Sequence, residues 1–164
     1  MNAPIVFLDI DGVLNHARWY AQLQPRLGTT KPVDWIDPAC VARLNRLCAD
    51  TGAAIVISSA WRTYLDHTEA VLREAGLTAP VVGATPDANP VSLDDPLRTH
   101  RGRAYEIQAW LRKHPRVKRY VILDDLKLRR VRWSRFVRTD LAVGLTDADC
   151  AKARAILART RAHG

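Results

Sequence analysis

Short, nearly continuous apolar runs constrain the fold of this chain more than any other feature of its sequence. The clearest are Pro4 to Ile10, Ala53 to Ser58 and Tyr120 to Asp124, with a shorter run at Val81-Val82 and a weaker one at Arg135 to Arg138. Apolar runs of this length, without alternating polar residues, are typical of strands that are covered on both faces. The chain is therefore expected to build a parallel sheet that is buried on both sides.

The stretches between these runs have the pattern of amphipathic helices. We expect one helix from Asp37-Pro38 to Gly52, and others at Thr63 to Ala75, Ala104 to Lys113 and Asp147 to Ala162, the last opened by a capping box of Thr146 and Asp149. The alternation of strand and helix predicts an α/β fold, with a doubly wound, mostly parallel sheet and helices on both faces.

Length and composition fit one globular domain, residues 1–164. The 164 residues are 48% hydrophobic, which is enough to bury a sizeable core. The first apolar run stops at Asp9, so we expect neither a signal peptide nor a membrane span, and the cytoplasm is the default compartment. Cys40, Cys48 and Cys150 show no zinc or disulfide spacing, and we expect reduced core residues.

Polar side chains follow three of the predicted strands at the point where each strand ends. They are Asp9 and Asp11, Ser58 and Ser59, and Asp124 and Asp125. Ligands of parallel sheets collect at the carboxyl ends of the strands, so one shared site is expected there. Asp9 and Asp11 point to the same side of an extended chain, and two such charges persist together most easily beside a cation. Taken singly, each pair also fits an ordinary turn, helix cap or solvated loop.

Longer motifs around these residues carry a resemblance to a known family. The segments "FLDIDGVLN", "IVISSAWR", "RAYEIQAWL", "YVILDDL" and "GLT" resemble the small standalone domains of the haloacid dehalogenase-like (HAD) superfamily that are related to those of bacterial RNA-repair proteins. The resemblance extends from Ile5 to about Leu157. It implies a HAD-like Rossmannoid fold.

The resemblance also implies a reaction, the hydrolysis of phosphate monoesters with Mg²⁺ through an aspartyl-phosphate intermediate. Asp9 would be the nucleophile, and Asp11 would protonate the leaving alcohol and then activate water. Asp124, with Asp125, would complete the magnesium site with Asp9, and the backbone carbonyl of Asp11 would also touch the metal.

The phosphate would be held by a hydroxyl and a basic side chain. Ser58 is the first candidate for the hydroxyl and Ser59 the alternative. The family's usual basic residue is lysine, but this chain offers Arg103 and Arg101. Arg103 is favoured because it lies at the start of a predicted helix and its guanidinium can grip two phosphoryl oxygens.

Short segments between the motifs indicate little or no cap domain, with residues 16–35 forming at most a small flap. An open site favours a bulky phosphate ester, such as the terminal phosphate of a nucleotide or nucleic acid. The net charge of +8 and the basic run from Lys127 to Arg135 fit this partner, although charge runs are more often solvated faces. The alternatives are a nucleic-acid-binding module with a vestigial HAD site, or another HAD reaction such as phosphotransfer. Asn15 and His16 follow the first motif closely and are candidates for contact with the substrate. Trp61, directly after the serines, either stacks on a base or packs under the following helix.

Overall fold

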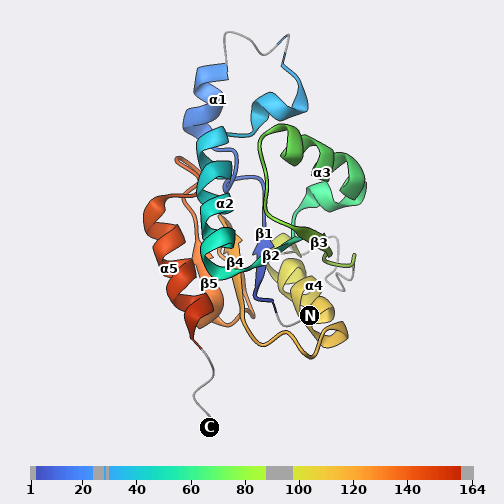
Figure 1. The fold of residues 1–164 in the computed structure, drawn as a ribbon. Helices are drawn as coiled ribbons and strands as arrows, with labels where there is room; N and C mark the ends of the chain where they lie inside the picture. Colours follow the sequence, from blue (N-terminus) through green and yellow to red (C-terminus); the bar gives the residue numbers. More distant parts are fainter. Residues whose placement is uncertain (1–2, 24–27, 29, 88–97, 160–164) are drawn as a thin grey trace.

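A five-stranded parallel sheet forms the centre of the computed structural model. The structure describes residues 3–23, 28, 30–87 and 98–159. Of residues 98, 100 and 101 it describes only the backbone. Its strands are β1 (Ile5–Leu8), β2 (Ala54–Ile57), β3 (Val81–Ala84), β4 (Tyr120–Asp124) and β5 (Phe136–Arg138), in the order β3-β2-β1-β4-β5. All neighbouring strands are parallel. The chain therefore winds outward from β1 in both directions, which confirms the predicted doubly wound α/β fold (Figure 1).

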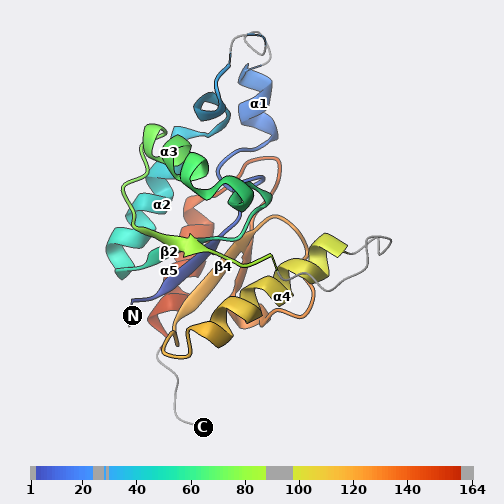
Figure 2. The same cartoon turned by 90° about the vertical axis from the view of Figure 1, so that its right-hand side faces the viewer.

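Alternate side chains of the strands enter two separate cores, one on each face of the sheet. Val6 and Leu8 of β1 pack with residues of α2 (Pro38–Thr51), α3 (Leu65–Glu74) and α5 (Asp147–Ala158). Ile5 and Phe7 point to the other face and pack with α4 (Arg98–Lys113). Figures 1 and 2 show α4 on the side of the sheet opposite α2 and α5. Burial on both faces is why the sequence of the central strands lacks polar alternation.

Two helices begin with the caps that their sequences predict. The carboxylate of Asp37 accepts a hydrogen bond from the backbone N–H of Ala39 at 2.8 Å, at the start of α2. The hydroxyl of Thr146 and the carboxylate of Asp149 form a capping box at the start of α5. These contacts satisfy backbone donors that have no partner inside the helix.

Three helix boundaries differ from the predicted ones. α4 begins at Arg98, six residues before Ala104, because its first turns are too polar to show an apolar stripe. α5 ends at Ala158 and not at Ala162, since Arg159 has extended backbone angles; residues 160–162 lie outside the described part of the chain. The expected helix from Thr63 instead comprises a 3₁₀ turn, η3 (Ala60–Tyr64), followed by α3.

The segment between β1 and α2 is short. It contains α1 (Ala17–Leu23) and a 3₁₀ turn, η2 (Pro32–Trp35), joined by a hydrogen bond of 2.8 Å from the indole nitrogen of Trp19 to the carbonyl of Asp34. Figure 2 shows α1 beyond the carboxyl ends of the strands.

Within the described ranges, none of the helices is both long enough and apolar enough to cross a membrane.

Candidate active site

Neighbouring strands bring Asp9, Ser58 and Asp124 to one edge of the sheet. The backbone N–H of Ser58 donates to the carbonyl of Leu8 at 2.7 Å, which places the end of β2 beside the end of β1. The backbone N–H of Asp9 donates to the carbonyl of Leu123 at 3.0 Å, which places the end of β1 beside the end of β4. The three side chains that the sequence placed at one sheet edge therefore lie on adjacent strands.

Three carboxylates gather at this edge. Asp9, Asp124 and Asp125 each offer one oxygen, and these oxygens lie within 4.8 Å of one another. Asp9 is 3% exposed and Asp124 is fully buried. One oxygen of Asp124 accepts a hydrogen bond of 2.9 Å from the backbone N–H of Leu126, which fixes its orientation. Hard carboxylate oxygens in this number and spacing suit Mg²⁺.

A buried guanidinium lies between two of these carboxylates. Nη1 of Arg103 contacts Oδ2 of Asp9 and lies 2.9 Å from Oδ2 of Asp124. Burial raises the pKa of Asp9 against the opposing effect of Arg103, and burial together with the charge of Asp9 raises the pKa of Asp124. One guanidinium thus leaves part of the negative charge of the cluster uncompensated. A divalent cation bound by Asp9, Asp124 and Asp125 would complete the compensation, so these residues fit a metal.

Asp11 lies outside this cluster and is exposed. Its Oδ1 accepts a hydrogen bond of 2.8 Å from the amide of Asn15, and its Oδ2 accepts one of 3.1 Å from the indole nitrogen of Trp61. Trp61 also packs against the core on the α2 face. Asn15 was a candidate for substrate contact and Trp61 was open between base stacking and packing; the structure places both against the Asp11 carboxylate. His16, the other candidate for substrate contact, is buried, and its Nε2 lies 2.9 Å from Oδ2 of Asp37.

The turn after Asp9 requires a glycine for two reasons. Gly12 has a left-handed backbone conformation with φ of +74°, and a Cβ built there would lie 2.5 Å from Cγ of Asp125. The hydroxyl of Thr139 donates to the carbonyl of Gly12 at 2.8 Å, which holds the turn from the β5 side. Asp125 therefore packs directly against the turn that carries Asp9 and Asp11.

Several buried hydroxyls lie at the same edge of the sheet. Among the described residues, Ser58 Oγ and Thr85 Oγ1 make no hydrogen bond. Ser59 Oγ also lacks a fully formed hydrogen bond, although it lies close enough to Asp9 to lower the pKa of that carboxyl. A buried hydroxyl without a partner is unfavourable, so these groups are available to a ligand oxygen.

Thr85 was not among the residues predicted from the sequence. It follows β3, and its backbone N–H donates to the carbonyl of Ile57 at 2.9 Å. The available signal was weak, because the predicted apolar run stopped at Val82 and Thr85 lies three residues further on, after the two residues by which β3 is longer.

A second arginine lies beside Arg103 and was also missed. Arg62 donates to Glu106 at 2.7 Å and lies 3.7 Å from Asp87. A pocket of about 260 Å³ is lined by Arg62, Arg103, Glu106 and Asp87, among others. Arg62 ends the motif "IVISSAWR", which was the signal for it. The side chain of Arg101, the other predicted phosphate ligand, lies outside the described residues.

Comparison with known proteins adds one positive result to this geometry. Searches of curated proteins and of solved structures gave no significant match. A family model described as the HAD domain in Swiss Army Knife RNA repair proteins matches residues 5–150. This range contains every strand of the sheet and each of the acidic, hydroxyl and arginine side chains described above. The chain therefore belongs to the family of HAD domains found in Swiss Army Knife RNA repair proteins.

Proposed function

We propose that the protein is a Mg²⁺-dependent phosphomonoesterase that works through an aspartyl-phosphate on Asp9. Family membership supports a HAD-type hydrolase or phosphotransfer role in general. The observation that carries the specific proposal is the cluster of Asp9, Asp124 and Asp125, with ligand oxygens within 4.8 Å of one another at the end of the central strand. A buried nucleophilic carboxylate beside further carboxylates is the donor set that phosphoryl transfer with a divalent cation needs.

Asp9, Asp124 and Asp125 would hold the metal, which when bound would neutralise charge on the carboxylates and on the phosphoryl oxygens. A carboxylate oxygen of Asp9 attacks phosphorus, and the bond from phosphorus to the ester oxygen breaks. Asp11 gives its proton to the departing oxygen and then takes a proton from the water that attacks the aspartyl-phosphate. Attack by water breaks the bond between Asp9 and phosphorus, releases inorganic phosphate and restores both carboxyl groups.

The remaining side chains of the site would bind and orient the phosphoryl group. The hydroxyls of Ser58 and Ser59 would donate to its oxygens, because both are buried and lack fully formed hydrogen bonds among the described residues. Arg103 would hold Asp9 in place and offer further N–H donors to the phosphate. Arg101 remains the alternative for this second role.

We further propose that the substrate carries its phosphate at the end of a nucleotide or nucleic acid. The short excursion that contains α1 and η2 supports a site open to a large substrate. The net charge of +8 favours a polyanion, and the matched family takes its description from RNA repair proteins.

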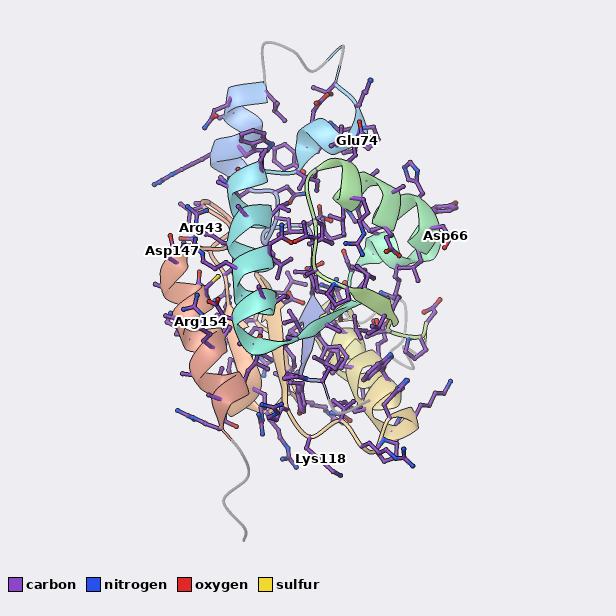
Figure 3. All side chains as sticks on the ribbon, in the orientation of Figure 1. Arg43, Asp66, Glu74, Lys118, Asp147 and Arg154 are labelled. Carbon is purple, nitrogen blue, oxygen red and sulfur yellow. The ribbon has the colours of Figure 1, made fainter. Side chains whose placement is uncertain are left out.

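Hydrolysis of an activated aryl phosphate tests the reaction. With Mg²⁺ the protein should turn over this substrate, chelation of the metal should stop turnover, and Asp9→Asn should abolish it with unchanged thermal unfolding. Asp66→Asn is the matched control, because Asp66 is an exposed carboxylate on α3 (Figure 3). In Asp11→Asn, mass spectrometry should detect a phosphoryl group on Asp9, since attack precedes the missing proton transfer when the leaving group is good. Near wild-type turnover by Asp9→Asn would remove Asp9 from the nucleophile role.

A further inference from the structure

A groove of about 720 Å³ lies between α4, β4 and the segment 130–135. Figure 2 shows α4 beside the chain that leaves β4. Its lining includes five basic residues, Arg112, Lys118, Arg130, Arg132 and Arg135. No acidic side chain lines the groove among the residues that the structure describes. The groove is distinct from the pocket beside Arg103, which contains two carboxylates.

The positive charge of the groove is largely uncompensated. Arg112, Lys118 and Arg132 are exposed, and in the described part of the chain their side chains take part in no hydrogen bond or ion pair. Three arginines on the α2 and α5 side, Arg43, Arg46 and Arg154, are paired with carboxylates instead, as Arg43 is with Asp147 (Figure 3). The unpaired cations of the groove therefore give this face a charge that an anionic polymer would complement.

Contacts within the protein hold the wall of the groove in place. Nη1 of Arg130 donates to the hydroxyl of Tyr105 at 2.6 Å, and the amide of Gln108 donates to the carbonyl of Arg130 at 2.9 Å. The guanidinium of Arg135 lies 5.4 Å from the centre of the Tyr120 ring. These contacts fasten the segment 130–135 to α4 and β4, so the groove is formed before a ligand binds.

The floor of the groove is apolar. Ile107 and Leu111 of α4 and Ile122 of β4 contribute to it, and the ring of Tyr120 also lines the groove. In proteins that bind single-stranded nucleic acid, apolar and aromatic surface contacts the bases, and neighbouring cations contact the phosphate backbone. A run of acidic side chains would pair with the cations of the groove but carries no base that could pack on its apolar floor.

The groove and the candidate active site are connected by α4. Arg103 and Arg112 lie on this helix, nine residues and therefore about 13 Å apart along its axis. A stacked strand advances about 3.4 Å per nucleotide, so about four nucleotides cover this distance.

We propose that the groove binds the backbone and bases of a single-stranded nucleic acid. The placement of the strand's phosphorylated end near Asp9 rests on the phosphatase reaction proposed above. Binding in the groove itself does not depend on that reaction.

Fluorescence anisotropy with a labelled oligonucleotide of about 12 nucleotides and no terminal phosphate tests the binding alone. The groove variant carries Arg112→Gln, Lys118→Gln and Arg132→Gln, three exposed positions outside the catalytic machinery. The control variant carries Arg46→Gln, Lys152→Gln and Arg159→Gln, three exposed positions on the α2 and α5 side. Both variants lose the same charge.

The groove variant should bind about tenfold to 100-fold more weakly at about 0.1 M salt, and the slope of log affinity against log salt should fall by about 2. The control variant should lose less than about threefold, because charges on the far side are screened. Equal losses in both variants, no loss in the groove variant, or equally good competition by polyglutamate would overturn the proposal.

Turnover of an aryl phosphate by the same preparations separates this proposal from the proposed function. The groove variant should keep wild-type turnover of that small substrate, and should show a raised KM with unchanged kcat on an end-phosphorylated oligonucleotide. Oligonucleotide binding that depends on the groove, without aryl phosphate turnover, would refute the phosphatase alone. Turnover without such binding would refute the groove proposal alone.

Discussion

Replacement of Gly12 by alanine should damage the candidate active site by displacing Asp125. Gly12 has φ of +74°, and an added Cβ would meet Cγ of Asp125 at 2.5 Å and Cβ of Asp125 at 2.6 Å. Gly52 provides a matched control, because it has φ of +65° and an added Cβ would meet no atom within 4 Å. The two substitutions share the backbone strain and differ in the collision.

The geometry sets the expected loss of stability. An alanine in the left-handed region costs about 1–2 kcal/mol, and this is the whole expected effect of Gly52→Ala. Gly12→Ala adds the cost of forcing an extra carbon into a packed site, about 1–3 kcal/mol. The free energy of unfolding should therefore fall by about 2–5 kcal/mol in Gly12→Ala. Displacement of Asp125 should also weaken activation by Mg²⁺ about 10- to 100-fold, an effect that Gly52→Ala should lack.

Urea unfolding and Mg²⁺ titration of aryl phosphate turnover measure the two effects. A double-mutant cycle with Asp125→Gly isolates the collision, because Gly12→Ala should cost about 1–3 kcal/mol less when the Asp125 side chain is absent. Equal losses of stability in Gly12→Ala and Gly52→Ala, with unchanged Mg²⁺ activation and no coupling to Asp125, would refute the reasoning.

Two further predictions concern hydrogen bonds around the site. Trp61→Phe removes the indole donor to Asp11. The kcat should fall about tenfold for an alkyl phosphate and less for an aryl phosphate, because only the poorer leaving group needs a well-placed acid. An equal fall of kcat for both substrates would contradict this prediction. Burial disfavours the charge of Asp37, but the hydrogen bond from His16 and the one from the Ala39 N–H outweigh it, so the pKa of Asp37 is lowered. Its charge therefore stabilises the fold above the unfolded pKa of about 3.9, and this contribution is lost as the pH falls through the lower folded pKa. Asp37→Asn keeps the helix cap but should lower the free energy of unfolding by about 1–3 kcal/mol at neutral pH. Urea unfolding of both proteins should show that this difference shrinks in acid. A difference that does not change with pH would contradict a stabilising role for the charge of Asp37.

Local patterns predicted the sheet well and three helix boundaries less well, the start of α4 least of all. The central strands were visible because both of their faces are buried, so apolar residues are continuous from Ile5 to Leu8 and from Ala54 to Ile57. The first turns of α4, with the sequence RTHRGR, have no apolar stripe. Without that stripe the start of the helix at Arg98 left no periodic signal.

Some residues of the candidate site could likewise be predicted from the sequence, and others could not. Asp9, Ser58 and Asp124 could be placed at one edge because the carboxyl ends of parallel strands meet there. Thr85 and Arg62 left only weak signals in the sequence. β3 extends to Ala84, beyond the predicted run at Val81-Val82, and Arg62 joins the site through Glu106 on α4.

By itself the sequence determined the strands and the acidic residues that end two of them, because both follow from spacing along a few residues. It also determined the parallel arrangement of the strands, which follows from the alternation of strand and helix along the chain. Only the tertiary structure decided that Arg103 contacts both Asp9 and Asp124, and that Asp125 packs against Gly12. Only the structure joined Arg112 and Lys118 to Arg132 around one groove. Such contacts depend on how helices pack on the two faces of the sheet, since packing brings together side chains that no local spacing relates.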